Sequence, residues 1–235
     1  MMYLAPVVYL IPSVIDELAI HTIPAYITDA LKACSTIFAE NERTARRFLK
    51  SICKEIVIDD YEWFTIHKSE PEQLNIFTQS LKANKTVAII SEAGCPGIAD
   101  PGQLLVAAAQ EMNVKVMPLV GPSSILLALM ASGMNGQRFE FAGYLPVDAS
   151  ERVRSILSLE SDSRKNKSTK IFIETPYRNN QLIEALLKTC QARTRLCIAS
   201  ELTSPNEFIR TKTIMEWKKE KTDFHKKAAI FLIQA

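Results

Sequence analysis

The sequence has few of the features that mark metal-binding, disulfide-rich and membrane proteins. Its five cysteines are scattered and include no CxxC pair, and its three histidines lie far apart. Disulfide frameworks and zinc sites need paired or regularly spaced ligands, so we expect neither a disulfide nor a metal. No uninterrupted apolar run reaches the roughly 18 residues that a membrane-spanning helix needs. We therefore expect a soluble, cytoplasmic protein without a metal or a membrane partner.

Common nucleotide-binding and hydrolase motifs are absent as well. The first apolar run, residues 7–11, is followed by Pro12 to Asp16 without a glycine, so there is no GxGxxG fingerprint at the first strand. The sequence also has no GxxxxGK[ST], HExxH or GxSxG motif. These absences disfavour a dinucleotide cofactor, a phosphate-binding loop, a zinc protease and a serine hydrolase.

Charge of neither sign dominates. There are 28 basic and 26 acidic residues, a net charge of +2, which does not by itself indicate a nucleic-acid partner. Two local basic runs remain, residues 164–170 and 212–227. Acidic residues interleave the second run (Glu216, Glu220 and Asp223), so a solvated face is the simpler interpretation and phosphate contact is the alternative.

Short β-branched runs alternate with longer segments of helical period, a pattern typical of α/β proteins with largely parallel strands. The pattern predicts strands at residues 7–11, 35–39, 87–90, 114–119, 139–142, 170–173, 195–199, 208–211 and 228–233. It predicts helices opened by Asp100 and Pro101, by Ser123, and by Thr175 and Pro176. Residues 160–168 are predicted to form a loop. The fold class is therefore α/β, and the turn at residues 143–147 predicts two α/β domains, residues 1–143 and 144–235.

The seven glycines are the most informative residues, because all of them fall between residues 94 and 143. Gly94, Gly121 and Gly143 each follow a predicted strand. Three such loops should gather at the carboxyl ends of neighbouring strands, where open α/β sheets bind ligands, and glycine lets backbone approach a ligand closely. The alternative is that glycine merely ends strands and caps helices, as we expect for Gly133 and Gly136.

Four motifs occur in order around these glycines: SEAGCP at residues 91–96, ADPG at 99–102, GPSS at 121–124 and FAGYLP at 141–146. Together they resemble the tetrapyrrole methylase superfamily, and most closely its branch similar to ribosomal RNA small subunit methyltransferase I. The segments AENER at 39–43, ETPYR at 174–178 and ASELT at 199–203 extend the resemblance over most of the chain.

The resemblance implies two α/β domains, S-adenosylmethionine held between them, and a homodimer. Carried over by position, the cofactor-binding residues are Gly94, Cys95, Ile98, Gly121, Ser123, Ser124, Tyr144, Ile173, Glu174 and Ala199. Backbone contacts should dominate there, and we expect Cys95 to be a small lining residue without thiol chemistry.

Methyl transfer from a sulfonium is an in-line displacement that needs no metal and no covalent enzyme intermediate, so positioning is the main demand. A ribose hydroxyl as acceptor would also benefit from a general base. The candidate catalytic residues facing the cleft that the resemblance implies are Glu174, Arg178 and Glu201, with Glu40 and Arg43 opposite. A structural ion pair is the alternative for each of them.

The methyl acceptor stays open at this point. The glycine-containing early segment of the family is replaced by Ile11 to Asp16, and the aspartate of its AEDTR segment is Asn41 here. Three functions remain: a methyltransferase acting on RNA ribose in rRNA processing, a methyltransferase acting on a small molecule or a protein, and a degenerate module that binds S-adenosylmethionine without catalysis.

Overall fold

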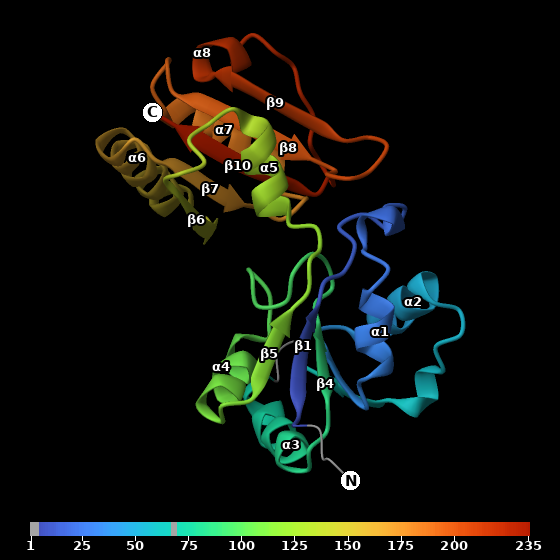
Figure 1. The fold of residues 1–235 in the computed structure, drawn as a ribbon. Coiled ribbons are helices and arrows are strands. Elements are labelled where there is room, and N and C mark those ends of the chain that lie inside the picture. The colour runs from blue at the N-terminus through green and yellow to red at the C-terminus, as the bar shows by residue number, and fades with distance from the viewer. Residues whose placement is uncertain (1–4, 67–69) are drawn as a thin grey trace. The chain divides into compact units, whose positions relative to one another are not determined.

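A computed structural model describes residues 5–66 and 70–235 (Figure 1). The chain forms two compact units, Met1–Ser123 and Ser124–Ala235. The division therefore falls about twenty residues before the predicted one at residue 143. The reason is that helix α5 (Ser124–Ser132) packs against strands of the second unit, and strand β6 (Phe139–Tyr144) belongs to the second sheet.

The first unit is built on a five-stranded sheet in which every pairing is parallel. Its strands are β1 (Val7–Ile11), β2 (Thr36–Ala39), β3 (Glu62–Thr65), β4 (Val87–Ile90) and β5 (Lys115–Pro118), in the order β3-β2-β4-β1-β5. Parallel sheets are covered on both faces, which explains why β2 and β4 are short, continuously buried runs. Because all five strands run the same way, their carboxyl ends meet at one edge.

Helices cover both faces of this sheet. They are α1 (Ile27–Lys32), α2 (Glu42–Ile52), α3 (Glu70–Lys82) and α4 (Gln103–Glu111), with short 3-10 turns at Ile20–Thr22 and Ile58–Asp60. Ile37 packs into the core under α1 and α2, and its neighbour Phe38 packs into the opposite core against Phe77. Helix α2 begins after Asn41, whose Oδ1 accepts hydrogen bonds from the N–H groups of Arg43 and Thr44.

The second unit has a mixed sheet in the order β6-β7-β10-β8-β9. Its other strands are β7 (Thr169–Ile173), β8 (Arg195–Ser200), β9 (Phe208–Thr213) and β10 (Ala229–Gln234), and its other helices are α6 (Ala149–Asn166), α7 (Asn179–Thr189) and α8 (Ile214–Trp217). The β6–β7 pairing is parallel and the other three are antiparallel. The prediction of largely parallel strands is thus right for the first unit and wrong for the second. Trp217, Phe172 and Phe231 anchor a core of its own.

All nine predicted strands are present, while β3 was missed. The predicted loop at residues 160–168 is wrong, because α6 continues to Asn166. Glu160 is buried inside that helix, where its Oε1 accepts hydrogen bonds from Gln191 N (2.8 Å) and from the Thr194 hydroxyl. This polar segment is therefore helical, and the polar groups on its buried face have hydrogen-bond partners.

Two predicted helix starts lie too early. Helix α4 begins at Gln103 after Gly102, not at Asp100 and Pro101, and α7 begins at Asn179 rather than after Thr175.

Candidate functional site

Three loops that follow β1, β4 and β5 are tied together at the carboxyl edge of the first sheet. Ser13 and Gly94 exchange two backbone hydrogen bonds, of 2.8 and 3.1 Å, and the Ser13 hydroxyl donates to Ser91 O at 2.8 Å. The Cys95 thiol lies 3.5 Å from Pro122 O, across to the third loop. Of the predicted cofactor residues, the structure therefore brings Gly94, Cys95 and Gly121 together.

The structure gives Gly121 a packing role that the sequence did not indicate. A Cβ built at this position would lie 2.1 Å from Pro12 Cβ and 2.4 Å from Pro12 Cγ. Glycine is needed here because the loop after β5 crosses the proline that follows β1, which closes the Cβ side of Gly121.

Gly143 also differs from expectation. It lies within β6 rather than after it, with φ +68°, at a register shift between Phe141 and Tyr144. The glycine therefore accommodates a β-bulge, for which a positive φ is suited.

An acidic group that was not among the sequence candidates lies in the loop after β4. Burial, together with the nearby carboxylates of Glu40 and Glu92, raises the pKa of Asp100 to about 7. The carboxylates are held in place, since Glu92 N donates to Glu40 Oε2 at 2.9 Å and Asn41 Nδ2 donates to Glu92 Oε1 at 3.1 Å. The sequence shows acidic residues after two strands, but not that they lie close together, and Asp100 before Pro101 fits a helix N-terminus equally well.

The predicted catalytic residues of the second unit occur as two ion pairs. Glu174 Oε1 accepts from Arg178 at 2.5 Å (Nη2) and 3.0 Å (Nε), and from Thr175 N at 2.6 Å. The Glu174 side chain is fully buried, and its Oε2 has no hydrogen-bond partner among the described residues. Glu201, which has φ +51°, pairs with Lys227 at 3.3 Å. These contacts match the structural alternative, and a catalytic role for these residues stays a prediction.

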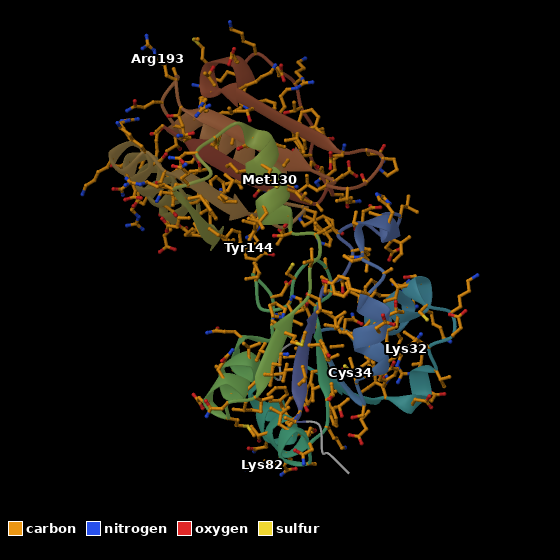
Figure 2. All side chains as sticks on the ribbon, viewed as in Figure 1. Lys32, Cys34, Lys82, Met130, Tyr144 and Arg193 are labelled. Carbon is orange, nitrogen blue, oxygen red and sulfur yellow. The ribbon has the colours of Figure 1, made fainter. Side chains whose placement is uncertain are left out.

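The remaining predicted residues occupy varied positions. Tyr144 is 60% exposed and lies opposite Ile173 in the β6–β7 register (Figure 2). Ala199 is fully buried within β8, so its side chain does not reach a surface. In the first unit Ile98 is exposed. Ser123 is the last residue of the first unit and Ser124 the first residue of the second.

Across the described ranges, no group of three or more histidine, cysteine, aspartate and glutamate residues is arranged to hold a metal ion. No helix in the same ranges combines the length and the apolar character needed to cross a membrane.

Two α/β units, one of them with glycine-bearing loops at a parallel sheet edge, are the architecture of a class of methyltransferases. A solved structure of uroporphyrin-III-C-methyltransferase from Thermus thermophilus shares this fold, with a TM-score of 0.55, 14% identity, and coverage of 98% of this chain and 93% of that one. The family model described as Tetrapyrrole (Corrin/Porphyrin) Methylases matches residues 23–217, and the chain belongs to this family. The resemblance and the two-domain α/β fold are thereby confirmed.

Relatives that carry the name ribosomal RNA small subunit methyltransferase I support the predicted branch of this family as well. One from Buchnera aphidicola (subsp. Schizaphis graminum) is 33% identical over 230 residues, covering 96% of this chain and 76% of the relative. One from Vibrio cholerae is 29% identical over 215 residues, covering 90% and 70%. The chain is accordingly a methyltransferase that depends on S-adenosylmethionine.

The carboxyl edge of the first unit suits parts of this cofactor. Ile98 and Val120 present exposed apolar side chains on two of its loops, which fit a nucleoside face or a thioether. A Cβ at Gly97 would meet nothing within 4 Å, so backbone there is open to close approach. Gly94, Cys95 and Ile98 stay predicted cofactor residues of this unit, and at Gly121 Pro12 covers the side on which a Cβ would stand.

Proposed function

We propose that the protein transfers a methyl group from S-adenosylmethionine to a ribose hydroxyl of small-subunit ribosomal RNA. The observation that supports an RNA acceptor is the separation of charge between the two units. The second unit contains 18 lysines and arginines against 12 acidic residues, a net charge of +6, whereas the first has 10 against 14, a net charge of −4. The near-neutral total conceals this difference, and a basic unit is the electrostatic footprint of phosphate binding.

The acidic residues that interleave the basic run of residues 212–227 are engaged in local contacts. Glu216 forms a capping box with Thr213 at the start of α8, and Glu220 pairs with Lys212. Asp223 accepts from Asn180 Nδ2 at 2.8 Å. The lysines that follow α8 (Lys218, Lys219 and Lys221) are exposed. Because the neighbouring carboxylates already have local partners, these exposed lysines are suited to contact the RNA backbone.

The cofactor supplies an electrophilic methyl group, and the protein has to align the acceptor oxygen and remove its proton. We propose that Glu174, Arg178 and Glu201 contribute to the acceptor side. The guanidinium of Arg178 is held by the buried Glu174 carboxylate on one side and is about a quarter exposed on the other, so it can bind a phosphate or hydroxyl oxygen in a fixed orientation.

We also propose a cytoplasmic homodimer. Helix α5 is apolar on its outer side as well, with Met130 79% exposed (Figure 2) and Leu126 half-exposed. A second copy of the chain would cover such a face. Light scattering of the parent and of Met130→Asp tests this, and a monomeric parent would contradict it.

The deciding experiment is a methylation assay with isotope-labelled cofactor on small-subunit RNA, cellular protein and small-molecule fractions. Label in the 2′-O-methyl nucleotides of the RNA supports the proposal. Label confined to another fraction would favour a small-molecule or protein acceptor. Calorimetric binding of S-adenosylhomocysteine without any turnover would instead indicate a degenerate binding module.

A further inference from the structure

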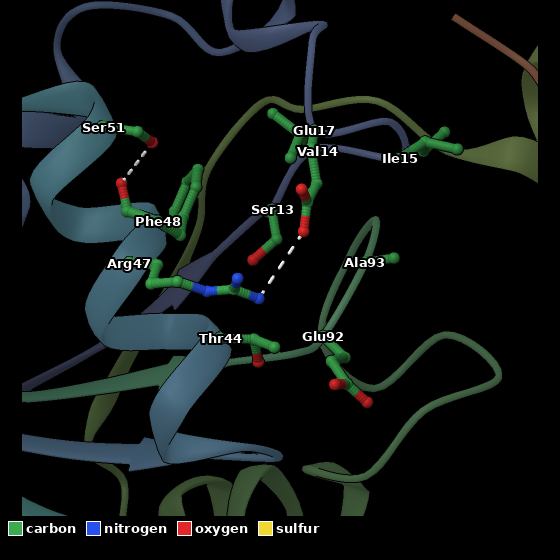
Figure 3. A pocket seen from close by; sticks show the side chains of 10 residues that line it. All are labelled: Ser13, Val14, Ile15, Glu17, Thr44, Arg47, Phe48, Ser51, Glu92 and Ala93. Atoms are coloured by element: carbon green, nitrogen blue, oxygen red, sulfur yellow. Dashed lines mark hydrogen bonds and ion pairs between the residues drawn. The ribbon is translucent and has the colours of Figure 1, made fainter. Parts of the chain in front are cut away.

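A cavity lies in the first unit, and its lining includes none of the predicted cofactor residues. Its volume is about 340 Å³, near the lower end of the range of roughly 300–1,000 Å³ for small-molecule sites. We call it the α2 pocket (Figure 3). It is lined by Ser13, Val14, Ile15, Glu17, Thr44, Arg47, Phe48, Ser51, Glu92 and Ala93.

One wall of the α2 pocket is a single face of helix α2. Thr44, the neighbours Arg47 and Phe48, and Ser51 follow one another at intervals of three or four residues, so their side chains project from the same side of the helix. Phe48 is anchored in the core, which gives the pocket a rigid apolar wall beside the two hydroxyl groups. Such a combination of apolar surface and a few polar groups is typical of sites for small organic ligands.

An ion pair stands at this pocket. Arg47 Nη2 lies 3.5 Å from Glu17 Oε1, and the two side chains are 63% and 86% exposed (Figure 3). Such an exposed pair contributes little to stability. A phosphate can therefore replace the Glu17 carboxylate as the partner of Arg47 at little energetic cost.

Helix α2 is also where this acidic unit concentrates its positive charge. Four of the unit's ten cations lie in the eleven residues of α2, against one acidic residue, Glu42. Arg46 is engaged, since it pairs with Glu42 at 2.6 Å and lies over the ring of Trp63. Arg47 is directed to the pocket, where it is the one cation of the lining beside the carboxylates of Glu17 and Glu92.

The α2 pocket adjoins the loops assigned to the cofactor. Its residue Ala93 precedes Gly94, and its residue Ser13 exchanges two backbone hydrogen bonds with Gly94. A ligand in the pocket would therefore sit beside the loop that we expect to hold the methyl donor. A base stacked in RNA cannot enter a pocket of this kind, so the nucleotide has to be extruded.

We propose that the α2 pocket binds one unstacked nucleotide of the RNA acceptor, with its phosphate on Arg47 and its nucleoside against Phe48 and Ala93. This inference rests on the proposed function, because it names the subsite for the acceptor. It assigns the basic second unit to the RNA backbone and the acidic first unit to a single nucleotide.

The test is a ligand-observed NMR titration of the full-length protein with the four ribonucleoside 5′-monophosphates and with inorganic phosphate. Arg47→Gln removes the phosphate partner, and Ala93→Leu fills the pocket at an exposed position. Lys50→Gln is the matched control, because it removes one positive charge from the same helix outside the pocket lining. Each variant is first checked for parental melting temperature and for parental affinity for S-adenosylhomocysteine.

We expect at least one monophosphate to bind the parent. Arg47→Gln should weaken that binding about tenfold, the loss expected for a charge-assisted contact, and Ala93→Leu should weaken it at least as much, because the larger side chain occupies the space of the nucleoside. Lys50→Gln should change it less than twofold. Equal weakening by Lys50→Gln, no effect of Ala93→Leu, or phosphate binding as tightly as any nucleotide would each overturn the proposal. If the parent methylates RNA while neither pocket substitution changes nucleotide affinity, the pocket assignment fails and the proposed function stands. If a nucleotide binds in the pocket but RNA is not labelled, the nucleotide pocket stands and the proposed function fails.

Discussion

Replacing Gly121 by alanine tests whether this glycine serves the fold or a ligand. The new Cβ would lie 2.1 Å from Pro12 Cβ, whereas ordinary contacts of a Cβ begin at 3.4 Å. The two loops must therefore separate by more than 1 Å, and a buried proline ring cannot rotate away. Overpacking of this kind costs about 1–3 kcal/mol, and the rigid neighbour favours the upper end.

In a unit of this size such a loss lowers the melting temperature by roughly 5–10 °C, which calorimetry of the full chain measures. The matched control is Gly136→Ala, because Gly136 has an ordinary φ and open space around its missing Cβ. In a Pro12→Gly background the additional cost of Gly121→Ala should largely disappear, a coupling that a double-mutant cycle detects. Equal costs in both backgrounds, or an unchanged melting temperature with weaker cofactor binding, would refute this reasoning.

Three further predictions follow from charge and burial. Because the folded-state pKa of Asp100 is raised to about 7, its contribution to stability is lost as pH rises from about 4 to 7. After allowance for solvent screening, Asp100→Asn should be more stable than the parent by about 1–2 kcal/mol at pH 8 and equal to it near pH 4, as measured by urea unfolding at both values. Glu174→Gln should destabilise the protein by about 1–3 kcal/mol, because Arg178 loses its charged partner; lost methyl transfer at parental stability would instead indicate a catalytic role. Replacing Lys218, Lys219 and Lys221 by glutamine should reduce the salt dependence of RNA binding by up to about 3 in the logarithmic slope, and identical retention of parent and variant on filters at two salt concentrations would exclude these lysines from the RNA site.

The parallel half of the fold was largely predictable from sequence, because each central strand is a short, fully buried β-branched run between helical segments. Strand β3 was not, since Glu62–Thr65 is an edge strand without a continuous apolar run. The end of α6 was missed for a related reason. Its inner face includes Glu160 and Ser163, whose partners lie far away in the sequence or beyond the helix end.

The candidate site was predicted in part. Motif positions correctly indicated that the loops carrying Gly94 and Gly121 lie together, but not that Pro12 fills the space at Gly121. The raised pKa of Asp100 depends on Glu40 and Glu92, which lie on loops after different strands, so no local pattern could indicate it. The α2 pocket forms where one face of α2 meets the loops after β1 and β4. No pattern in the sequence predicted that these three segments meet.

The second sheet ends in strands that are poor templates for another chain. At one edge β6 carries the bulge at Gly143, which interrupts its register with β7. At the other edge β9 carries Arg210 and Lys212, both paired with Glu220. Bulges and charged side chains at sheet edges oppose the addition of further strands. A sheet with such edges has little tendency to aggregate edge to edge, even at high protein concentration.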